Sequence, residues 1–121
     1  YKSIDECTKI EDPNVALLSS VLQYVEKPFE IFSNIMNLNI DMIILDRTPF
    51  IKNSDHDLIK IQKTPSSIYS AVYPIHFFNK DNFYNFISSH HYEIEIEFKS
   101  LDRLDPLATW EGMIIKRMKS K

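Results

Sequence analysis

Residues 43–50 read Ile-Ile-Leu-Asp-Arg-Thr-Pro-Phe, an apolar run that ends in an acid, a guanidinium, a hydroxyl and a proline. Buried parallel strands are continuous apolar runs, and α/β proteins bind ligands at the carboxyl ends of such strands. The stretch therefore predicts a strand from Ile40 to Asp46 in an α/β binding or catalytic fold. The single glycine, Gly112, excludes glycine-rich nucleotide-binding loops from this sequence.

The residues upstream predict a partner for this strand. Residues 15–19 form an apolar run of strand length, and Pro28 suits the first turn of a helix. Apolar side chains then recur every three or four residues, which predicts a helix ending near Asn39. Strand, helix and strand within about thirty residues predict a right-handed βαβ unit with two parallel strands.

The residues downstream predict a long connection, a helix and two further strands. Residues 52–74 are polar and rich in Ser, Tyr and Pro, with residues 59–62 alternating as an edge strand would, so we expect an irregular binding loop or lid. Asn79 is the expected N-cap of a helix over residues 80–89. Residues 92–98 alternate strictly, which predicts one apolar face and one face of glutamates. Residues 110–118 supply the closing strand, and the last two strands should pair antiparallel.

Composition limits the class of protein. With 121 residues, 44% of them apolar, the sequence predicts a single domain over residues 1–121. The net charge of -3 argues against nucleic acid or an anionic membrane surface as a partner. The single cysteine, Cys7, allows no internal disulfide, and no apolar run approaches a membrane span, so we expect a cytoplasmic protein. The start at Tyr1, without methionine, suggests a piece of something longer.

Several of these segments resemble class I S-adenosylmethionine-dependent methyltransferases, and more specifically a family of bacterial methyltransferases often linked with surface polysaccharide genes. The resemblance covers Val15 to Arg117. It rests on the following segments: Leu18-Ser19-Ser20-Val21-Leu22-Gln23-Tyr24, Leu45-Asp46-Arg47-Thr48-Pro49-Phe50, Ile61-Gln62, Tyr69, Tyr73-Pro74 and Gly112-Met113-Ile114-Ile115-Lys116-Arg117. It implies the C-terminal half of a Rossmann-like fold, whose last strand inserts antiparallel beside the fifth.

The resemblance also implies what this sequence lacks. In the parent fold, the glycine-rich turn after the first strand and the acid that holds the ribose would lie upstream of Tyr1. We therefore expect this chain to bind S-adenosylmethionine weakly or not at all. Without the upstream half, residues 15–19 would form an exposed apolar edge, and such edges pair with other chains. A homo-oligomer assembled through that edge is the expected consequence.

Four residues are candidates for binding the acceptor substrate. Asp46 and Arg47 could hold a carboxylate, a sugar hydroxyl or a phosphate, because guanidinium donates hydrogen bonds in a rigid fork. The alternative is a structural contact between them or with Asp55 and Asp57. Aromatic residues are frequent from Tyr69 to Phe86; Tyr69 and Tyr73, which have polar tips, are the better pocket candidates, and core packing is the alternative for the phenylalanines.

The resemblance places Ser19, Ser20 and Gln23 beside the methyl donor. Gln23 could equally cap the following turn. His76 is the best candidate for a general base, because imidazole exchanges protons near neutral pH, although its neighbours Phe77 and Phe78 also suit a packed, structural histidine.

The other three histidines are weaker candidates for a catalytic or metal-binding role. His90 and His91 are expected to cap a helix end, and His56 lies between two aspartates without a further ligand cluster, so no metal site is predicted. The function expected is methyl transfer to an oxygen or nitrogen of a sugar or other small acceptor. One alternative is a non-enzymatic interaction or oligomerisation module on the same α/β scaffold. The other is a small-molecule binding domain of the receiver type, which this sequence supports less because it shows neither the early acidic cluster nor the strand-end lysine of such domains.

Overall fold

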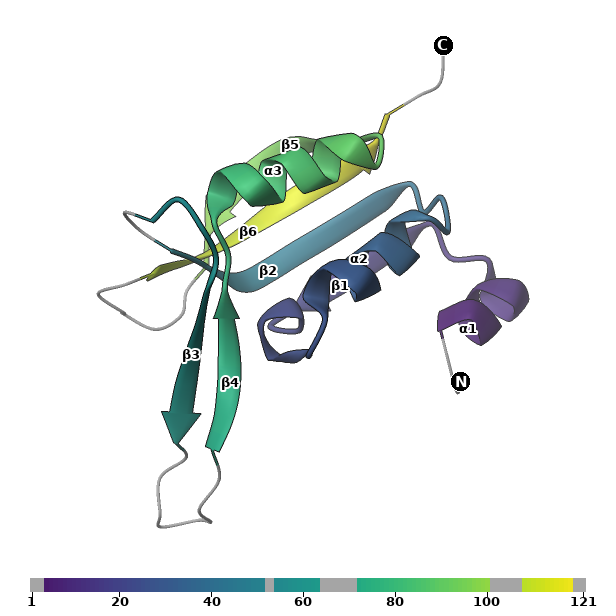
Figure 1. Cartoon of the computed structure of the whole chain (residues 1–121). Coiled ribbons are helices and arrows are strands. Elements are labelled where there is room, and N and C mark those ends of the chain that lie inside the picture. The colour runs from purple at the N-terminus through teal and green to yellow at the C-terminus, as the bar shows by residue number, and fades with distance from the viewer. Residues whose placement is uncertain (1–3, 52–53, 64–71, 101–107, 119–121) are drawn as a thin grey trace.

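The computed structural model describes residues 4–51, 54–63, 72–100 and 108–118. The strands form one four-stranded sheet and a separate two-stranded hairpin (Figure 1). The elements in chain order are α1 (Ile4–Glu11), β1 (Val15–Ser19), the short 3-10 helix η1 (Leu22–Tyr24), α2 (Pro28–Met36), β2 (Met42–Ile51), β3 (Leu58–Lys63), β4 (Val72–Phe77), α3 (Lys80–Ser89), β5 (Tyr92–Lys99) and β6 (Ala108–Arg117).

The main sheet has the strand order β1-β2-β6-β5. β1 and β2 are parallel, with Val15 opposite Met42 and Ser19 opposite Asp46. β6 lies between β2 and β5 and is antiparallel to both. The predicted α/β class, with a parallel pair and a closing antiparallel pair, is confirmed. So is the insertion of the last strand that the methyltransferase resemblance implied.

Two helices cover one face of this sheet. α2 lies over β1 and β2, and α3 lies over β6 and β5 (Figure 1). The apolar face predicted for α2 buries Phe32, whose ring lies 5.5 Å from that of Phe83 on α3. The Phe83 ring also packs edge-on against Phe50 of β2 at 5.2 Å. Burial of these large rings is the main favourable term for this part of the fold.

α3 begins where the sequence predicts. The Asn79 side chain accepts a hydrogen bond from the Asn82 backbone N–H at 3.0 Å, which satisfies one of the unpaired donors of the first turn. α2 begins at Pro28 as predicted but ends at Met36, before the predicted end near Asn39. Asn39 has a φ of 58°, and this left-handed conformation ends helices.

The connection between β2 and α3 contains a hairpin that the sequence analysis predicted only in part. Residues 59–62 do form a strand, β3, but residues 72–77, expected to be irregular up to Pro74, form its partner β4. Pro74 pairs with Ile61 there. A proline is tolerated because each strand of a two-stranded hairpin has an outer edge that needs no ladder hydrogen bond. Residues 64–71 lie outside the described part of the chain.

β2 is longer than predicted. It continues to Ile51 instead of ending at Asp46, and its pairing with β6 shifts register between Leu45 and Thr48. Asp46 and Arg47 form this bulge, with Arg47 at a φ of 51°. They therefore lie at the level where β1 ends, inside a long strand and not after it. β2 continues beyond Asp46 because β6 still pairs with it there, whereas β1 ends opposite Asp46.

β5 departs from the predicted alternation. Its pairing with β6 shifts between Ile94 and Ile96, so Glu95 is an extra residue in the ladder. A bulge reverses the faces on which later side chains lie. Tyr92 is buried and Ile94 half-buried, whereas Ile96 is 51% exposed and Phe98 37% exposed. The apolar face predicted for the whole strand covers the core only at its beginning.

Candidate functional site

The polar residues after β1 meet the bulge in β2. The N–H of Ser20, which has a φ of 57°, donates to the Asp46 carbonyl at 3.0 Å. The N–H of Arg47 donates to the Asp46 carboxylate at 2.8 Å and to the Ser100 hydroxyl at 3.0 Å. Ser100 in turn donates to that carboxylate at 2.6 Å. These hydrogen bonds hold Ser20 and Arg47 in left-handed backbone conformations. Such conformations are unfavourable for residues other than glycine, and in proteins they are found most often at functional sites.

Gln23 joins these residues from η1. Its side chain is 1% exposed, and its amide nitrogen donates to the Ser20 hydroxyl at 3.0 Å and to the Arg47 carbonyl at 2.9 Å. Among the described residues, its side-chain oxygen is buried without a hydrogen-bond partner. Buried polar atoms are normally paired, so this oxygen needs an explanation.

His76 projects from β4 and is held by an aspartate. Its Nε2 lies 2.7 Å from the Asp57 carboxylate, and both side chains are mostly buried. The ring stacks on Phe78 with centroids 4.4 Å apart and meets the edge of Phe29 at 6.0 Å. The packed environment offered as the alternative to a general base is present, together with a carboxylate partner that a base would use.

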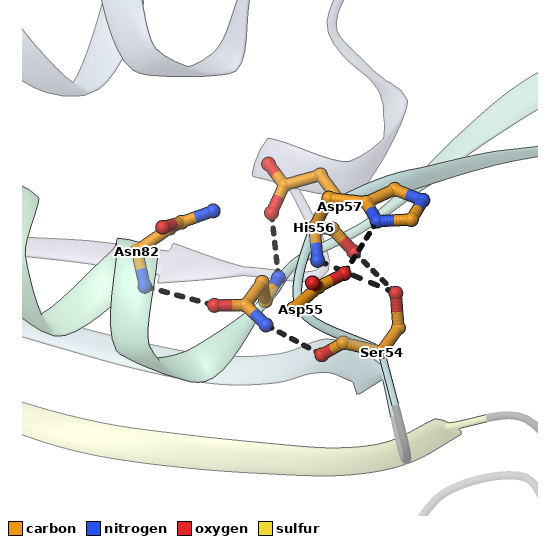
Figure 2. Close-up of polar contacts among 6 residues, drawn as sticks. Ser54, Asp55, His56, Asp57 and Asn82 are labelled. Carbon is orange, nitrogen blue, oxygen red and sulfur yellow. Dashed lines mark hydrogen bonds and ion pairs between the residues drawn. The ribbon is translucent and has the colours of Figure 1, made fainter.

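Asp57 is itself fixed at the start of α3. Its second carboxylate oxygen accepts from the Asn79 backbone N–H at 2.6 Å, and the Asn79 side-chain amide donates to the Ser54 carbonyl at 2.7 Å. Figure 2 shows the loop from Ser54 to Asp57 beside the first turn of α3. In the same loop, the hydrogen bond from His56 lowers the pKa of the Asp55 carboxyl.

A cavity of about 440 Å³ lies between η1 and the β3–β4 hairpin. It is lined by Gln23, Tyr24, Val25, Glu26, Ile59, Pro74 and His76. It therefore brings Gln23, a candidate for the cofactor side, together with His76, the candidate base. A larger cavity of about 560 Å³ opens near His90 and Arg117, at the amino ends of β2 and β5. Ligands of α/β folds bind at the carboxyl ends of parallel strands, so the smaller cavity is the candidate site.

The other predicted site residues have mixed positions. Ser19 is exposed at the end of β1. Arg47 is also exposed, and its guanidinium has no ion-pair partner among the described residues; Asp55 and Asp57, considered as partners, pair with His56 and His76 instead. Tyr73 lies in β4 opposite Gln62, but its side chain is not described. Tyr69 lies outside the described residues.

Two contacts of the cluster were not predicted from the sequence: Asp57 with His76, and Ser100 with the bulge in β2. Asp57 became visible only through the hairpin register, because Leu58 pairs with Phe77 and this pairing carries Asp57 to His76 across nineteen positions. Ser100, at the end of β5, reaches the bulge only because β6 lies between β2 and β5. No local sequence signal marks either contact.

The described residues add two negative findings. They contain no group of three or more potential metal ligands, and none of their helices is long and apolar enough to cross a membrane.

Comparison with known proteins supports a fold assignment. No protein-family model matches the sequence, and no similar sequence is found among curated proteins. Solved structures of similar fold include the following three proteins. The N-terminal domain of EvdMO1 with bound SAH has a TM-score of 0.52 and 11% identity, covering 88% of this chain and 46% of that one. A Burkholderia thailandensis 1,6-didemethyltoxoflavin-N1-methyltransferase has a TM-score of 0.55 and 10% identity, covering 88% and 44%. An S-adenosylmethionine-dependent methyltransferase from Clostridium acetobutylicum ATCC 824 has a TM-score of 0.51 and 8% identity, covering 87% and 57%.

The chain thus has a methyltransferase-like α/β fold, structurally similar to class I S-adenosylmethionine-dependent methyltransferases at low sequence identity. It spans about half the length of those structures. Fold similarity at this identity does not define an activity, which has to be argued from the site.

Proposed function

We propose that this chain forms the acceptor-facing half of an S-adenosylmethionine-dependent methyltransferase that modifies an oxygen or nitrogen of a small acceptor. The observation that carries the proposal is the cavity that Gln23 and His76 share at the carboxyl end of β1. A cavity lined by a hydrogen-bonding side chain and by a potential base is what positioning and deprotonation of an acceptor require.

The residues present fit one side of a cofactor site. Ser20 and Gln23 follow β1, and the Gln23 amide nitrogen donates to the Ser20 hydroxyl beside the cavity that Gln23 lines. Ser19 is exposed beside them. The glycine-rich turn and the ribose-binding acid of doubly wound folds have no counterpart in this sequence. S-adenosylmethionine would therefore need further residues for tight binding, and this chain alone should bind it weakly or not at all.

When bound, S-adenosylmethionine supplies a methyl group whose bond to sulfur breaks as a bond to the acceptor forms, with the electron pair returning to sulfur. This chain contributes positioning and proton removal. Arg47 is exposed at the bulge and can hold a polar group of the acceptor, and Tyr73 is proposed to orient the same molecule. His76 can take the acceptor proton, because Asp57 stabilises the resulting imidazolium.

Calorimetry tests the proposal most directly. S-adenosylmethionine is titrated into this chain and into a longer protein that contains it. Binding by the longer protein alone would support the proposal, and Arg47→Ala in that protein should then reduce methyl transfer. Binding by neither would leave only a similarity of fold, and tight binding by this chain alone would contradict the expected division of the site.

The second candidate function is an interaction module that assembles through β1. β1 is an edge strand of the described sheet, and its side chains Val15 and Leu17 are 47% and 65% exposed. Exposed apolar edges pair with other strands, so we propose a homo-oligomer that covers this edge. A concentration-dependent rise in mass by light scattering would support it. A monomer at high concentration would count against it.

A further inference from the structure

A row of aliphatic side chains crosses the face of the main sheet that lies opposite to α2 and α3. Its members stand directly across from one another on β1, β2, β6 and β5: Leu17, Ile44, Ile114 and Ile96. Leu18, the neighbour of Leu17, lies in the core beneath the two helices, and successive side chains of a strand point to opposite faces. The row therefore lies on the face that α2 and α3 leave uncovered (Figure 1).

Much of this surface is accessible in the described part of the chain. Leu17 is 65% exposed and Ile96 is 51% exposed, while Ile44 and Ile114 are half-buried between them. Phe98, two residues beyond Ile96 on the same face, is 37% exposed. We refer to these five side chains together as the open face. Contiguous exposed apolar surface of this kind marks interaction sites in proteins.

The bulge in β5 brings two of these side chains to the open face. Ile94 packs against the helix-covered core, whereas Ile96 lies opposite Ile114, because Glu95 is an extra residue in the ladder. Without this extra residue, Ile96 and Phe98 would join Ile94 beneath α3. Bulges re-aim side chains, and this one moves two large apolar groups out of the core. A partner that covers the open face would explain why these positions are apolar.

β1 and β2 are apolar on both of their faces. Residues 15–18 and 42–45 are unbroken apolar runs, and such runs are typical of parallel strands that are buried on both sides. α2 covers one side of this pair (Figure 1). The other side belongs to the open face, and β1 is an edge strand of the described sheet. The sequence of the pair therefore suits a second cover and a further neighbouring strand.

The handedness of strand crossovers indicates what this second cover is. α2 leads from β1 towards β2 and lies on one face of the sheet. Crossovers between parallel strands share one hand, so a helix that leads away from β2 lies on the other face. Strands added at the free edge of β1 and wound in that direction bring helices to the side of the open face. This chain covers 46% and 44% of two similar solved structures, so each of them contains a further segment of comparable length.

The chemistry of the surface determines what its partner must present. The row contains only aliphatic side chains, and charged residues border it at one end, where Lys116 lies opposite Glu93. An amphipathic helix, with an apolar stripe and polar residues beside it, matches such a surface. Neighbouring strands lie about 4.8 Å apart and a helix is about 10 Å wide, so two helices cover four strands. α2 and α3 do the same on the other face (Figure 1).

We propose that two amphipathic helices cover the open face, and that they belong to a complementary half of the domain that joins the sheet at β1 and winds away from it. The inference rests on the proposed function, since both take this chain as one half of a methyltransferase-like domain. The direction of winding then reverses at β1, which makes the carboxyl end of β1 a topological switch point. Ser19 and Ser20 lie at that end, so docking of the second half would complete the candidate site.

Thiol reactivity in the longer protein tests this proposal. Cys7→Ser removes the single cysteine of this chain, any cysteines elsewhere in the longer protein are replaced likewise, and Ile96→Cys or Asn85→Cys is then introduced. Both positions are exposed in the described chain. Ile96 lies on β5, at the opposite edge of the sheet from β1, so an added strand alone would not protect it.

The two alkylation rates decide the outcome. Ile96→Cys should react about 100-fold more slowly than the control Asn85→Cys under native conditions, because a covered thiol reacts only when the interface opens. In urea the two rates should be equal. A native difference of less than about 10-fold would mean that the open face stays uncovered, and it would overturn the proposal.

Protein concentration separates this partner from a second copy of the chain. Helices of the same molecule protect Ile96→Cys equally at every concentration, whereas protection by a second copy is lost on dilution. The alkylation rate is therefore measured over a wide range of protein concentration. A constant rate is expected. Loss of protection on dilution would refute the proposed occupant and identify a face shared between copies of this chain.

A charged substitution gives a second readout, which also decides the question should Ile96→Cys fail to fold. Ile96→Lys places an ammonium group in the proposed interface, so it should lower the urea midpoint of the longer protein more than Asn85→Lys does. Ile96 is 51% exposed in the described chain, so a role confined to this chain predicts no such difference. Equal midpoints in the two variants would contradict the proposal.

The outcomes separate this inference from the proposed function. S-adenosylmethionine binding by a longer protein in which Ile96→Cys reacts freely would refute the inference and leave the methyltransferase proposal standing. A protected open face without cofactor binding would support the inference and refute the methyltransferase proposal.

Discussion

Replacing Gly112 with alanine should destabilise this chain, although alanine normally costs less entropy on folding than glycine. A Cβ at position 112 would lie 2.3 Å from two carbons of the Phe98 ring and 2.7 Å from the Leu45 carbonyl oxygen. Non-bonded carbon atoms prefer separations of about 3.5–4.0 Å, so both neighbours would have to move. Gly112 is therefore required by the close approach of three strands, not by a turn.

The loss of stability depends on which of the two neighbours, the Phe98 ring or the Leu45 carbonyl, can move away from the added Cβ. The Phe98 ring is 37% exposed and can rotate towards solvent. The Leu45 carbonyl cannot, because Leu45 lies opposite Met113 in the β2–β6 ladder. Overpacking of this kind costs about 1–3 kcal/mol, against a gain of about 0.4–1 kcal/mol from a less flexible unfolded chain. The net loss in the free energy of unfolding should be about 1–2 kcal/mol.

Urea unfolding followed by far-ultraviolet circular dichroism measures this loss. A double-mutant cycle with Phe98→Ala separates the two contacts, because the smaller side chain relieves the ring contact and leaves the carbonyl contact. Most of the loss should persist in the Phe98→Ala background. An increase in stability on Gly112→Ala would refute the close packing of β6 between β2 and β5.

Three further perturbations have defined outcomes. Asn79→Ala should reduce the free energy of unfolding by about 1 kcal/mol through loss of the α3 cap, while Asn85→Ala, as a control for exposed positions, should change it little. Tyr92→Phe should cost about 1–2 kcal/mol in urea unfolding, because the Tyr92 hydroxyl donates to the buried Ile40 carbonyl at 2.5 Å. Burial raises the pKa of Tyr92, so the folded chain holds the Tyr92 hydroxyl proton more tightly than the unfolded chain does. The free energy of unfolding should therefore fall above about pH 10, where the unfolded chain loses this proton, and it should fall less in Tyr92→Phe. Leu17→Lys should lower the mass measured by light scattering if β1 mediates assembly, and an unchanged oligomer would exclude that edge.

Residues with strong local patterns were predicted well. The apolar runs that became β1 and β2, the helical spacing around Phe32 and the cap at Asn79 are each specified within a few residues. Burial and capping act over one or two turns, so the sequence contains the information locally. The insertion of β6 was expected only from the resemblance to methyltransferases, because strand order depends on contacts between distant segments.

The strands around the site were predicted less well. β2 extends beyond Asp46 because β6 offers it a partner there, and the Arg47 bulge absorbs the change of register. β4 was not expected at all, because Pro74 disfavours a strand in most sheets. Only its pairing with β3 makes the segment extended. The same pairing carries Asp57 to His76, and neither residue type reveals that contact.

Sequence information alone thus established the α/β class, the parallel pair β1 and β2, the caps and the residue types available for binding, because these follow from periodicity and from local hydrogen bonding. The tertiary structure decided how those residues are brought together at the candidate site. The left-handed turns at Ser20 and Arg47, the buried oxygen of Gln23 and the contact between Asp57 and His76 all depend on segments far apart in the chain. Long-range packing creates such contacts, and no local pattern encodes them.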